Sequence, residues 1–308
     1  MKIVTLTLSA AIDVHHYVDS LELGHENFVK ALGRDAGGKG INISRALNSF
    51  GVENVALAVL GKDNYSEFAE LLSKEGMSVM PILVPGHIRE NVTVHTKGGE
   101  ETRISLTAES LPSDTLGKIE AVTDEILKEG DVLTFTGSIP SGTSKTDVIG
   151  YLTRQREKGI RLIVDSRSLS LNDLSQIKPF LIKPNEYEIE NYVGYTVRGR
   201  EEAKAVAQSL RKLGIDNVMI TLGERGAVIS SSEGCFAATV PCVEVRSTIG
   251  AGDSTIAGFI YALYNGNDLK KAFVTAVAFG SSACLTEGTK PPLRETVIEM
   301  LENGIFVE

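Results

Sequence analysis

The segment Ser247-Thr248-Ile249-Gly250-Ala251-Gly252-Asp253-Ser254 is a loop of small residues that leads into the apolar helical stretch 255–260. Its glycines let backbone N–H groups approach an anion closely, and the helix dipole adds partial positive charge there. Asp253 falls in the first turn, where an aspartate either caps the helix, worth about 1 kcal/mol, or accepts a proton from an attacking hydroxyl. The segment predicts an anion hole beside a carboxylate, which is typical of a kinase.

Short β-branched runs alternate with helical patterns through most of the chain. Strand-like runs occupy residues 55–60, 131–136, 161–165, 180–183 and 217–221, and apolar residues at helical spacing occupy 63–75, 113–128, 145–158, 200–213 and 255–264. This repeated βα pattern predicts an α/β fold with a mainly parallel sheet. Such sheets bind ligands at the carboxyl ends of their strands, so residues that directly follow strands are the first candidates for a site.

Two segments, 15–35 and 79–107, interrupt this alternation. In the second, residues 91–96 and 101–106 alternate around Gly98-Gly99, which predicts a hairpin. We interpret both segments as strands outside the main sheet, forming a small β lid from about 15–35 and 88–107. Because neither a tandem repeat nor a low-complexity linker separates them from the rest, residues 1–308 are expected to form a single domain with the lid inserted.

A second glycine-rich approach to a helix reads Gly37-Gly38-Lys39-Gly40-Ile41-Asn42-Ile43-Ser44-Arg45. It is not a P-loop, because the spacing GxxxxGK[ST] is absent. The two glycines alone fit a flexible turn equally well. Lys39 and Asn42 within the turn favour recognition of a polar ligand.

Polar residues also lie at the ends of four other strands. Asn185 and Glu188, in Lys183-Pro184-Asn185-Glu186-Tyr187-Glu188, have a spacing that suits water-mediated binding of Mg²⁺ and a helix capping box equally well. Thr221-Leu222-Gly223-Glu224-Arg225-Gly226 offers glycines to the phosphates or ribose of a nucleotide. Ser138 and Asp165 also lie at strand ends, where position alone does not separate ligand contacts from ordinary turn chemistry.

Composition narrows the class of protein. The chain has 308 residues, 42% hydrophobic and 23% charged, which is ordinary for a folded protein with a sizeable core. A formal charge of −9 argues against a general nucleic-acid binder. Cys235, Cys242 and Cys284 lack metal-ligand spacing and do not suggest a disulfide framework. With no signal peptide and no apolar run that could span a membrane, we expect a cytoplasmic protein without membrane partners.

Taken together and in this order, the glycine-lysine-asparagine segment near residue 40 and the GAGD segment near residue 250 resemble the two signatures of the PfkB, or ribokinase-like, carbohydrate kinase family. The resemblance covers nearly the whole chain, with intermediate motifs at residues 136–140, 165, 183–188 and 221–226. It implies a three-layer α/β/α sandwich with a mainly parallel central sheet and a small β lid. In this family the lid often contributes to a dimer interface, so a homodimer through the lid is expected.

The resemblance also implies a role for each motif, with ATP and Mg²⁺ as cofactors. Asp253 would be the general base, and the anion hole would be formed by Gly250, Ala251 and Gly252. The sugar would be held by Asp13, Gly37, Gly38, Lys39, Asn42 and Ser138. The nucleotide would be held by Lys183, Asn185, Thr221, Gly223 and Gly226. Asn185 and Glu188 would hold Mg²⁺ through water.

Within the family, the chain is most similar to the bacterial 1-phosphofructokinase and tagatose-6-phosphate kinase group. Arg89 and Arg103 on the lid carry this resemblance, because that group uses lid cations against the phosphate already on the sugar, and arginine matches phosphate oxygens bidentately. Alternatively, both are solvated strand charges. Two departures are visible: Ser9-Ala10 replaces the usual asparagine-proline pair, and Arg167 follows Asp165 where a small glycine-containing turn is common.

The resulting hypothesis is transfer of phosphate from ATP to D-fructose 1-phosphate, giving fructose 1,6-bisphosphate, with D-tagatose 6-phosphate as the alternative substrate. A catalytically silent sugar-phosphate-binding protein on the same fold is an alternative of another class. Asp253 and the intact GAGD loop argue against that alternative. Arg89 and Arg103 argue against a third reading, a nucleoside or ribose kinase.

Overall fold

The structure is a computed structural model that describes residues 1–99, 101–241 and 243–308. Its main element is a nine-stranded sheet with the order β13-β12-β11-β10-β9-β8-β1-β4-β5. The strands are β1 (Ile3–Thr7), β4 (Val55–Gly61), β5 (Met80–Val84), β8 (Val132–Thr136), β9 (Arg161–Asp165), β10 (Leu181–Ile182), β11 (Asn217–Thr221), β12 (Ala227–Ser231) and β13 (Gly234–Ala238). Neighbours from β5 to β11 pair in parallel, and β12 and β13 add an antiparallel hairpin at one edge.

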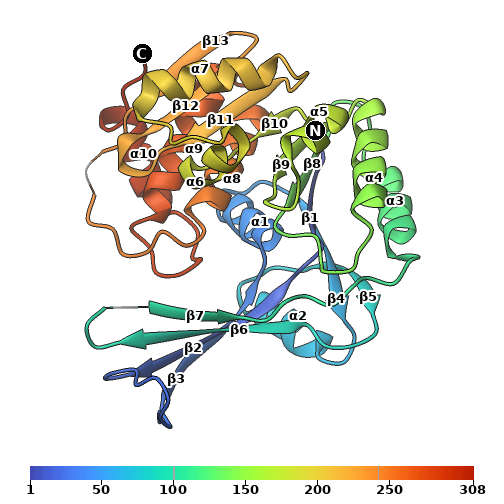
Figure 1. The fold of residues 1–308 in the computed structure, drawn as a ribbon, viewed down its shortest axis with the longest axis vertical. Helices are drawn as coiled ribbons and strands as arrows, with labels where there is room; N and C mark the ends of the chain where they lie inside the picture. The colour runs from blue at the N-terminus through green and yellow to red at the C-terminus, as the bar shows by residue number, and fades with distance from the viewer. Residues whose placement is uncertain (100, 242) are drawn as a thin grey trace.

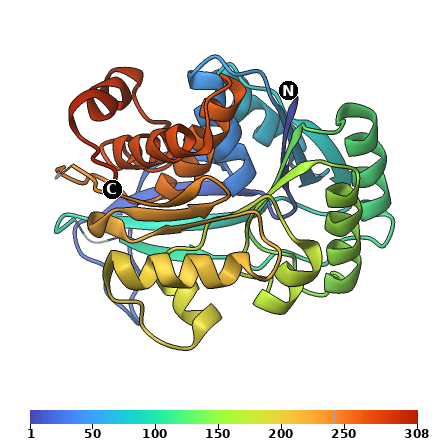
Figure 2. The same cartoon turned by 90° about the horizontal axis from the view of Figure 1, so that it is seen from above.

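Helices cover both faces of this sheet, which makes three layers (Figures 1 and 2). One face carries α1 (Lys39–Ser49), α8 (Ala251–Tyr264), α9 (Leu269–Ala283) and α10 (Arg294–Asn303). The other carries α3 (Thr115–Ile126), α4 (Lys145–Glu157), α5 (Leu171–Ile177), α6 (Glu186–Val193) and α7 (Gly199–Arg211). Each face has its own apolar cluster, because a parallel sheet buried on both sides needs apolar residues on both. No helix in the described part of the chain is both long and apolar enough to cross a membrane.

A separate four-stranded sheet, the lid, projects beyond one end of the main sheet (Figure 1). Its order is β3-β2-β6-β7, formed by β2 (Ala11–Val18), β3 (Lys30–Gly37), β6 (Arg89–Thr96) and β7 (Glu101–Ser105). β2 pairs antiparallel with β3 and parallel with β6, and β6 and β7 form the predicted hairpin. One side of the lid packs on α2 (Tyr65–Lys74) through Ile12, Val14 and Phe68. Asp13 and His15, the alternate residues of β2, lie on the opposite side of the lid.

The α/β architecture with a small β lid is confirmed, with two differences from the sequence interpretation. Residues 80–84 belong to the main sheet as β5, because Ile82 packs into the core beside β4 instead of joining the lid. The first lid strands begin at Ala11 and end at Gly37, which brings the glycine-rich turn to the base of the lid.

Candidate active site

The GAGD loop lies where α8 begins. Gly250 is the N-cap with φ 78°, a left-handed conformation that glycine adopts without strain. Asp253 follows in the first turn and is 5% exposed. Its Oδ2 accepts a hydrogen bond of 2.8 Å from Nδ2 of Asn42 on α1, so the carboxylate faces the glycine-rich turn. The two signature segments therefore meet at this carboxylate, although they are about 200 residues apart.

Burial sets the protonation behaviour of Asp253. It raises the pKa of this carboxyl to about 6, because a charged group loses its hydration there. The ammonium of Lys39 and the hydrogen bond from Asn42 act in the opposite direction and limit the rise. The carboxylate is thus ionised at neutral pH yet basic enough to take a proton, which is the range expected of a general base.

Two lysines converge on Asp165 at the end of β9. Nζ of Lys39 lies 2.9 Å and Nζ of Lys183 lies 3.7 Å from Oδ2 of Asp165. Burial would raise the pKa of Asp165, but the two ammonium groups outweigh it and hold the pKa below its ordinary value. A Cβ built on Gly252 would lie 3.0 Å from Nζ of Lys183, so this ammonium also lies against the GAGD loop. Two ammonium groups therefore lie beside the α8 N-terminus with Asp165 as their shared counter-charge, and together with the helix N-terminus they suit an anionic ligand.

Asn185 and Glu188 form a capping box at the start of α6. Oδ1 of Asn185 accepts from the backbone N–H of Glu188 at 2.9 Å, and Oε2 of Glu188 accepts from that of Asn185 at 3.0 Å. Nε of Arg167 donates to the remaining oxygen, Oε1, at 2.8 Å. The capping alternative is therefore present in the structure. The Mg²⁺ role stays a prediction, and in the described residues no group of three or more histidine, cysteine or acidic side chains could hold a metal directly.

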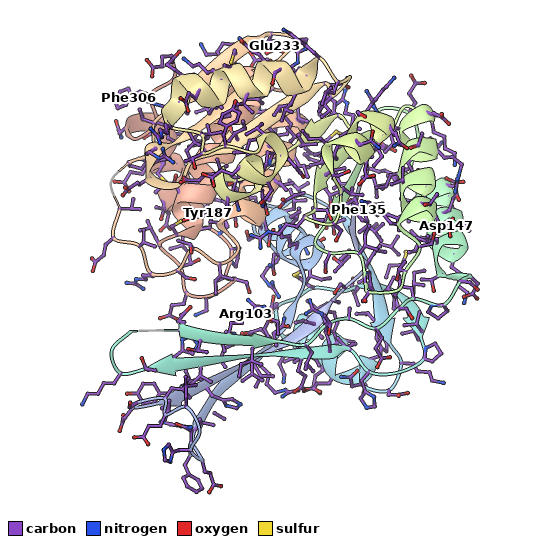
Figure 3. All side chains as sticks on the ribbon, viewed as in Figure 1. Arg103, Phe135, Asp147, Tyr187, Glu233 and Phe306 are labelled. Carbon is purple, nitrogen blue, oxygen red and sulfur yellow. The ribbon has the colours of Figure 1, made fainter. Side chains whose placement is uncertain are left out.

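The inner side of the lid carries a second polar group, centred on Asp13 of β2. Its Oδ1 accepts from Nδ2 of Asn91 and from Nη2 of Arg103, each at 2.7 Å. Arg89 donates to Oδ1 of Asn91 at 2.9 Å and to the backbone oxygen of Ser9 at 3.3 Å. Both arginines are thus oriented by this group, and Figure 3 shows Arg103 between the lid and the main sheet. Burial lowers the pKa of Arg89, and the nearby charge of Arg103 lowers it further.

The other predicted residues are distributed around these groups. Gly37 lies against Asp13, since a Cβ on Gly37 would lie 2.3 Å from Oδ2 of that carboxylate. Gly38 has φ 135° and precedes α1. Ser138 is exposed after β8.

The predicted nucleotide-side residues end β11 and begin the next turn. Thr221 pairs with Asn185 in an isolated parallel bridge. Gly223 opens the short helix η1 (Gly223–Arg225), and the space where its Cβ would lie is empty to 4 Å. Gly226, at φ 94°, packs against the backbone oxygen of Ala238, where any side chain would clash. Of these glycines, Gly223 is therefore the one that leaves room for a ligand.

Sequence reasoning missed two residues that organise the site and left the role of a third open. Asn91 and Arg45 were not singled out, and Asp165 was left undecided between ligand contact and turn chemistry. Asp165 could have been found, because a buried aspartate at a strand end needs cationic partners and two lysines lie in neighbouring motifs. Asn91 could have been found from its register, since it lies directly opposite Asp13 on the same side of the lid.

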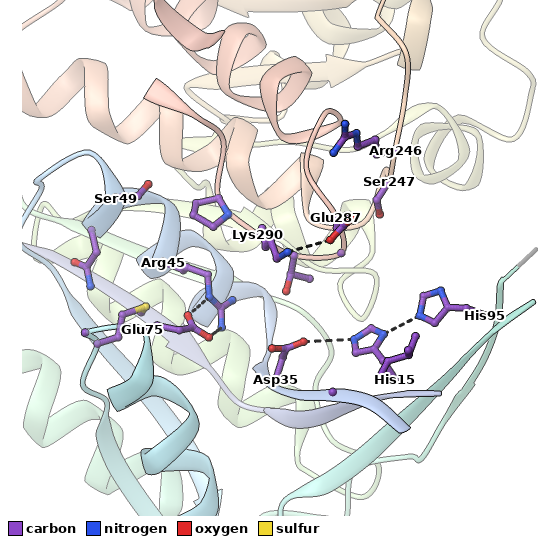
Figure 4. A pocket seen from close by; sticks show the side chains of 18 of the residues that line it. His15, Asp35, Arg45, Ser49, Glu75, His95, Arg246, Ser247, Glu287 and Lys290 are labelled. Carbon is purple, nitrogen blue, oxygen red and sulfur yellow. Dashed lines mark hydrogen bonds and ion pairs between the residues drawn. The ribbon is translucent and has the colours of Figure 1, made fainter. Parts of the chain in front are cut away.

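A cavity of about 1030 Å³ separates the lid from the C-terminal loops. Figure 4 shows His15, Asp35 and His95 on its lid side, with Arg246 and Lys290 on the opposite side. The cavity lies on the outer side of α1, and its lining includes none of the residues predicted for sugar or nucleotide. Arg246 and Ser247, which precede the GAGD loop in the chain, also line this cavity.

A mainly parallel α/β sandwich with a separate β lid, and with a glycine loop that begins a helix beside a buried carboxylate, is the arrangement of small-molecule kinases of the ribokinase-like type. The model of the pfkB family of carbohydrate kinases matches residues 2–296. The chain therefore belongs to the pfkB family of carbohydrate kinases.

Individual relatives agree with this assignment. The chain is 33% identical to 1-phosphofructokinase of Haemophilus influenzae, over 90% of each chain. It is 35% identical to 1-phosphofructokinase of Escherichia coli, over 85% of this chain and 84% of that one. Phosphofructokinase-2 from Escherichia coli in complex with fructose-6-phosphate has a TM-score of 0.90, with 26% identity and 98% of each chain covered.

Proposed function

We propose that this protein transfers the terminal phosphoryl group of ATP to a hydroxyl of D-fructose 1-phosphate, which gives fructose 1,6-bisphosphate and ADP. The observation that carries the proposal is Asp253, a buried carboxylate with a pKa of about 6 that lies beside the Gly250–Gly252 amides. The carboxylate takes the proton of the attacking hydroxyl, and the hydroxyl oxygen bonds to the terminal phosphorus of ATP as the bond from that phosphorus to the bridging oxygen breaks and ADP leaves. The amides and the lysine cluster stabilise negative charge on that phosphoryl group.

The residues present fit ATP and Mg²⁺. Lys39 and Lys183 supply positive charge beside the GAGD loop, and the open space at Gly223 leaves room for the nucleotide. Asn185 and Glu188 offer oxygen atoms but already serve as a capping box, so we propose that they hold Mg²⁺ through water. When bound, Mg²⁺ supplies charge neutralisation for the nucleotide phosphates.

The lid supplies the argument for a phosphorylated sugar. Asp13 holds Arg103, whose side chain is 37% exposed, while Asn91 and the backbone oxygens of Ser9 and Leu106 hold Arg89. We propose that Asp13 and Asn42 bind sugar hydroxyls and that the two arginines bind the phosphate already present. The names of the curated relatives favour fructose 1-phosphate over the fructose 6-phosphate bound by the solved relative.

The direct test is to incubate the purified protein with MgATP and fructose 1-phosphate and to identify the product by ³¹P NMR. We expect a new phosphate monoester at the 6-position, formed in equal amount with ADP. ADP formed without a bisphosphate, or no reaction at all, would contradict the proposal.

Replacing Arg103 by glutamine is expected to raise the KM for fructose 1-phosphate by about 10- to 100-fold, because a hydrogen bond to a charged group contributes about 1.5–3 kcal/mol. The KM for ATP should change little, and both constants are obtained from initial rates. Arg34→Gln is the matched control, since Arg34 pairs with Glu67 on the other side of the same lid. An unchanged sugar-phosphate KM in Arg103→Gln would show that this arginine does not bind the substrate.

We further propose that residues 1–308 act as one kinase domain and that the protein dimerises through the lid. Exposed apolar residues on the lid strands and on the connection between β2 and β3 support this assembly: Leu23, Phe28, Val29, Leu32 and Ile104. Apolar patches of this kind are typical of protein interfaces. Sedimentation equilibrium should give twice the mass of the chain, and Phe28→Asp should lower it to the monomer. A monomer at all concentrations would exclude the lid interface.

A further inference from the structure

Arg45 on α1 is a buried arginine to which the proposed function assigns no role. It is 7% exposed, and its guanidinium contacts three residues, of which Figure 4 shows Glu75. Nε and Nη2 pair with the carboxylate of Glu75, Nη2 also donates to the backbone oxygen of Ala36 at 2.7 Å, and Nη1 donates to Oδ1 of Asn42 at 2.8 Å. A buried arginine with acceptors on three sides is fixed in orientation, so each acceptor is fixed as well.

The contact with Asn42 determines which end of that amide faces Asp253. Oδ1 of Asn42 accepts from Arg45, and Nδ2 of the same amide donates to Oδ2 of Asp253 at 2.8 Å. The reversed amide would place its NH₂ group against a guanidinium and its oxygen against a carboxylate. Both contacts would then be repulsive, so the guanidinium selects the orientation in which an N–H points at Asp253.

We propose that Arg45 is a positioning residue for Asp253: by fixing the amide of Asn42, it keeps an N–H donor on the carboxylate that accepts the substrate proton. This inference rests on the proposed function only in giving Asp253 the role of base. The hydrogen bond itself favours the ionised form of Asp253 whatever the substrate.

Because Arg45 is paired with Glu75, it affects Asp253 through the orientation of the Asn42 amide and not through its own charge. Glu75 bonds the guanidinium through two nitrogens and compensates its charge locally. A compensated ion pair exerts a weak field at a distance, whereas a fixed amide transmits its effect through a direct hydrogen bond. The same guanidinium also donates to the backbone oxygen of Ala36 near the end of β3, so it connects the lid with the side-chain amide of Asn42.

The test measures the pKa of Asp253 directly by ¹³C NMR on protein labelled at aspartate Cγ, with the signal assigned by its loss in Asp253→Asn. The variant Arg45→Met/Glu75→Gln removes both charges of the pair, so the net charge near the site is unchanged. We expect the pKa of Asp253 to rise by about one unit in this variant, because one hydrogen bond to the carboxylate is lost. Asn42→Ala should raise the pKa of Asp253 by a similar amount. Adding Asn42→Ala to Arg45→Met/Glu75→Gln should raise it no further.

The control Arg154→Met/Glu120→Gln removes an arginine-glutamate pair of similar geometry between α3 and α4 and should leave the pKa unchanged. Two results would overturn the inference: an unchanged pKa of Asp253 in Arg45→Met/Glu75→Gln, or a rise that adds to that of Asn42→Ala.

If the double variant does not fold, Arg45→Lys serves instead, since lysine keeps the positive charge but not the forked geometry of the guanidinium. An unchanged pKa in Arg45→Lys would equally overturn it. Because no turnover is needed, the outcome is independent of whether fructose 1-phosphate is the substrate.

Discussion

Replacing Asp253 by asparagine is expected to lower kcat by about 10²–10⁴-fold, the usual contribution of a general base. The KM values should change far less, because the amide keeps the shape of the side chain and its contact with Asn42. The measurement is a steady-state rate at saturating ATP and sugar phosphate. Asp147→Asn is the control, since Asp147 also lies in the first turn of a helix, α4, and is exposed there. Normal turnover in Asp253→Asn would remove Asp253 from the mechanism.

The same substitution should make the protein more stable at neutral pH. The folded-state pKa of Asp253 is raised to about 6, so the folded protein binds a proton more tightly than the unfolded chain does. Stability is therefore lost as pH rises from about 4 to about 6, and the full cost, about 3 kcal/mol, applies above that range. Urea unfolding of Asp253→Asn should show a gain of this order at pH 8 that disappears near pH 4. A gain that is the same at both pH values would contradict the raised pKa.

Asp165→Asn is expected to lower the free energy of unfolding by about 3 kcal/mol at neutral pH. The substitution leaves the ammonium groups of Lys39 and Lys183 without their shared carboxylate, and Lys183 is only 3% exposed. Urea unfolding measures the loss. In Asp124→Asn, the control, the exposed pair with Lys158 is broken and a loss below about 1 kcal/mol is expected. Equal losses in the two variants would show that Asp165 is not a buried charge centre.

The pH dependence of this effect has the opposite sign to that of Asp253. The folded-state pKa of Asp165 is held below its ordinary value by Lys183 and Lys39 against the effect of burial. Its stabilisation is therefore present above the unfolded-state pKa and is lost as pH falls through the folded-state value. The difference between the unaltered protein and Asp165→Asn should shrink in acid.

The main sheet and the GAGD helix were predictable because they depend on local pattern. Strands 161–165 and 217–221 were predicted to the residue, since apolar β-branched runs bounded by polar residues are decisive. Residues 80–84, which form β5, were instead placed outside the main sheet with the rest of segment 79–107; β5 is an edge strand, and its Met80 and Leu83 are exposed. Register and edge position depend on tertiary packing, which a short segment does not encode.

The candidate site was predicted as a set of motifs but not as a network. Asn42 and Asp253 were both expected in the site from their loops. Their direct hydrogen bond depends on how α1 packs against α8 on the same face of the main sheet, and so does the contact of Arg45 with Asn42. Arg45 carries no local signal, because a single arginine within a helix usually lies in solvent. Only its burial beside Glu75 distinguishes it.

The central claim is that this protein phosphorylates a sugar that already carries a phosphate. It is tested most directly by comparing kcat/KM, from MgATP-dependent ADP release, for fructose 1-phosphate, tagatose 6-phosphate, fructose 6-phosphate, free fructose, ribose and adenosine. We predict strong turnover confined to the phosphorylated sugars, with fructose 1-phosphate the best of them. Turnover only on unphosphorylated compounds would contradict the roles of Arg89 and Arg103, and no turnover on any of them would contradict catalysis itself.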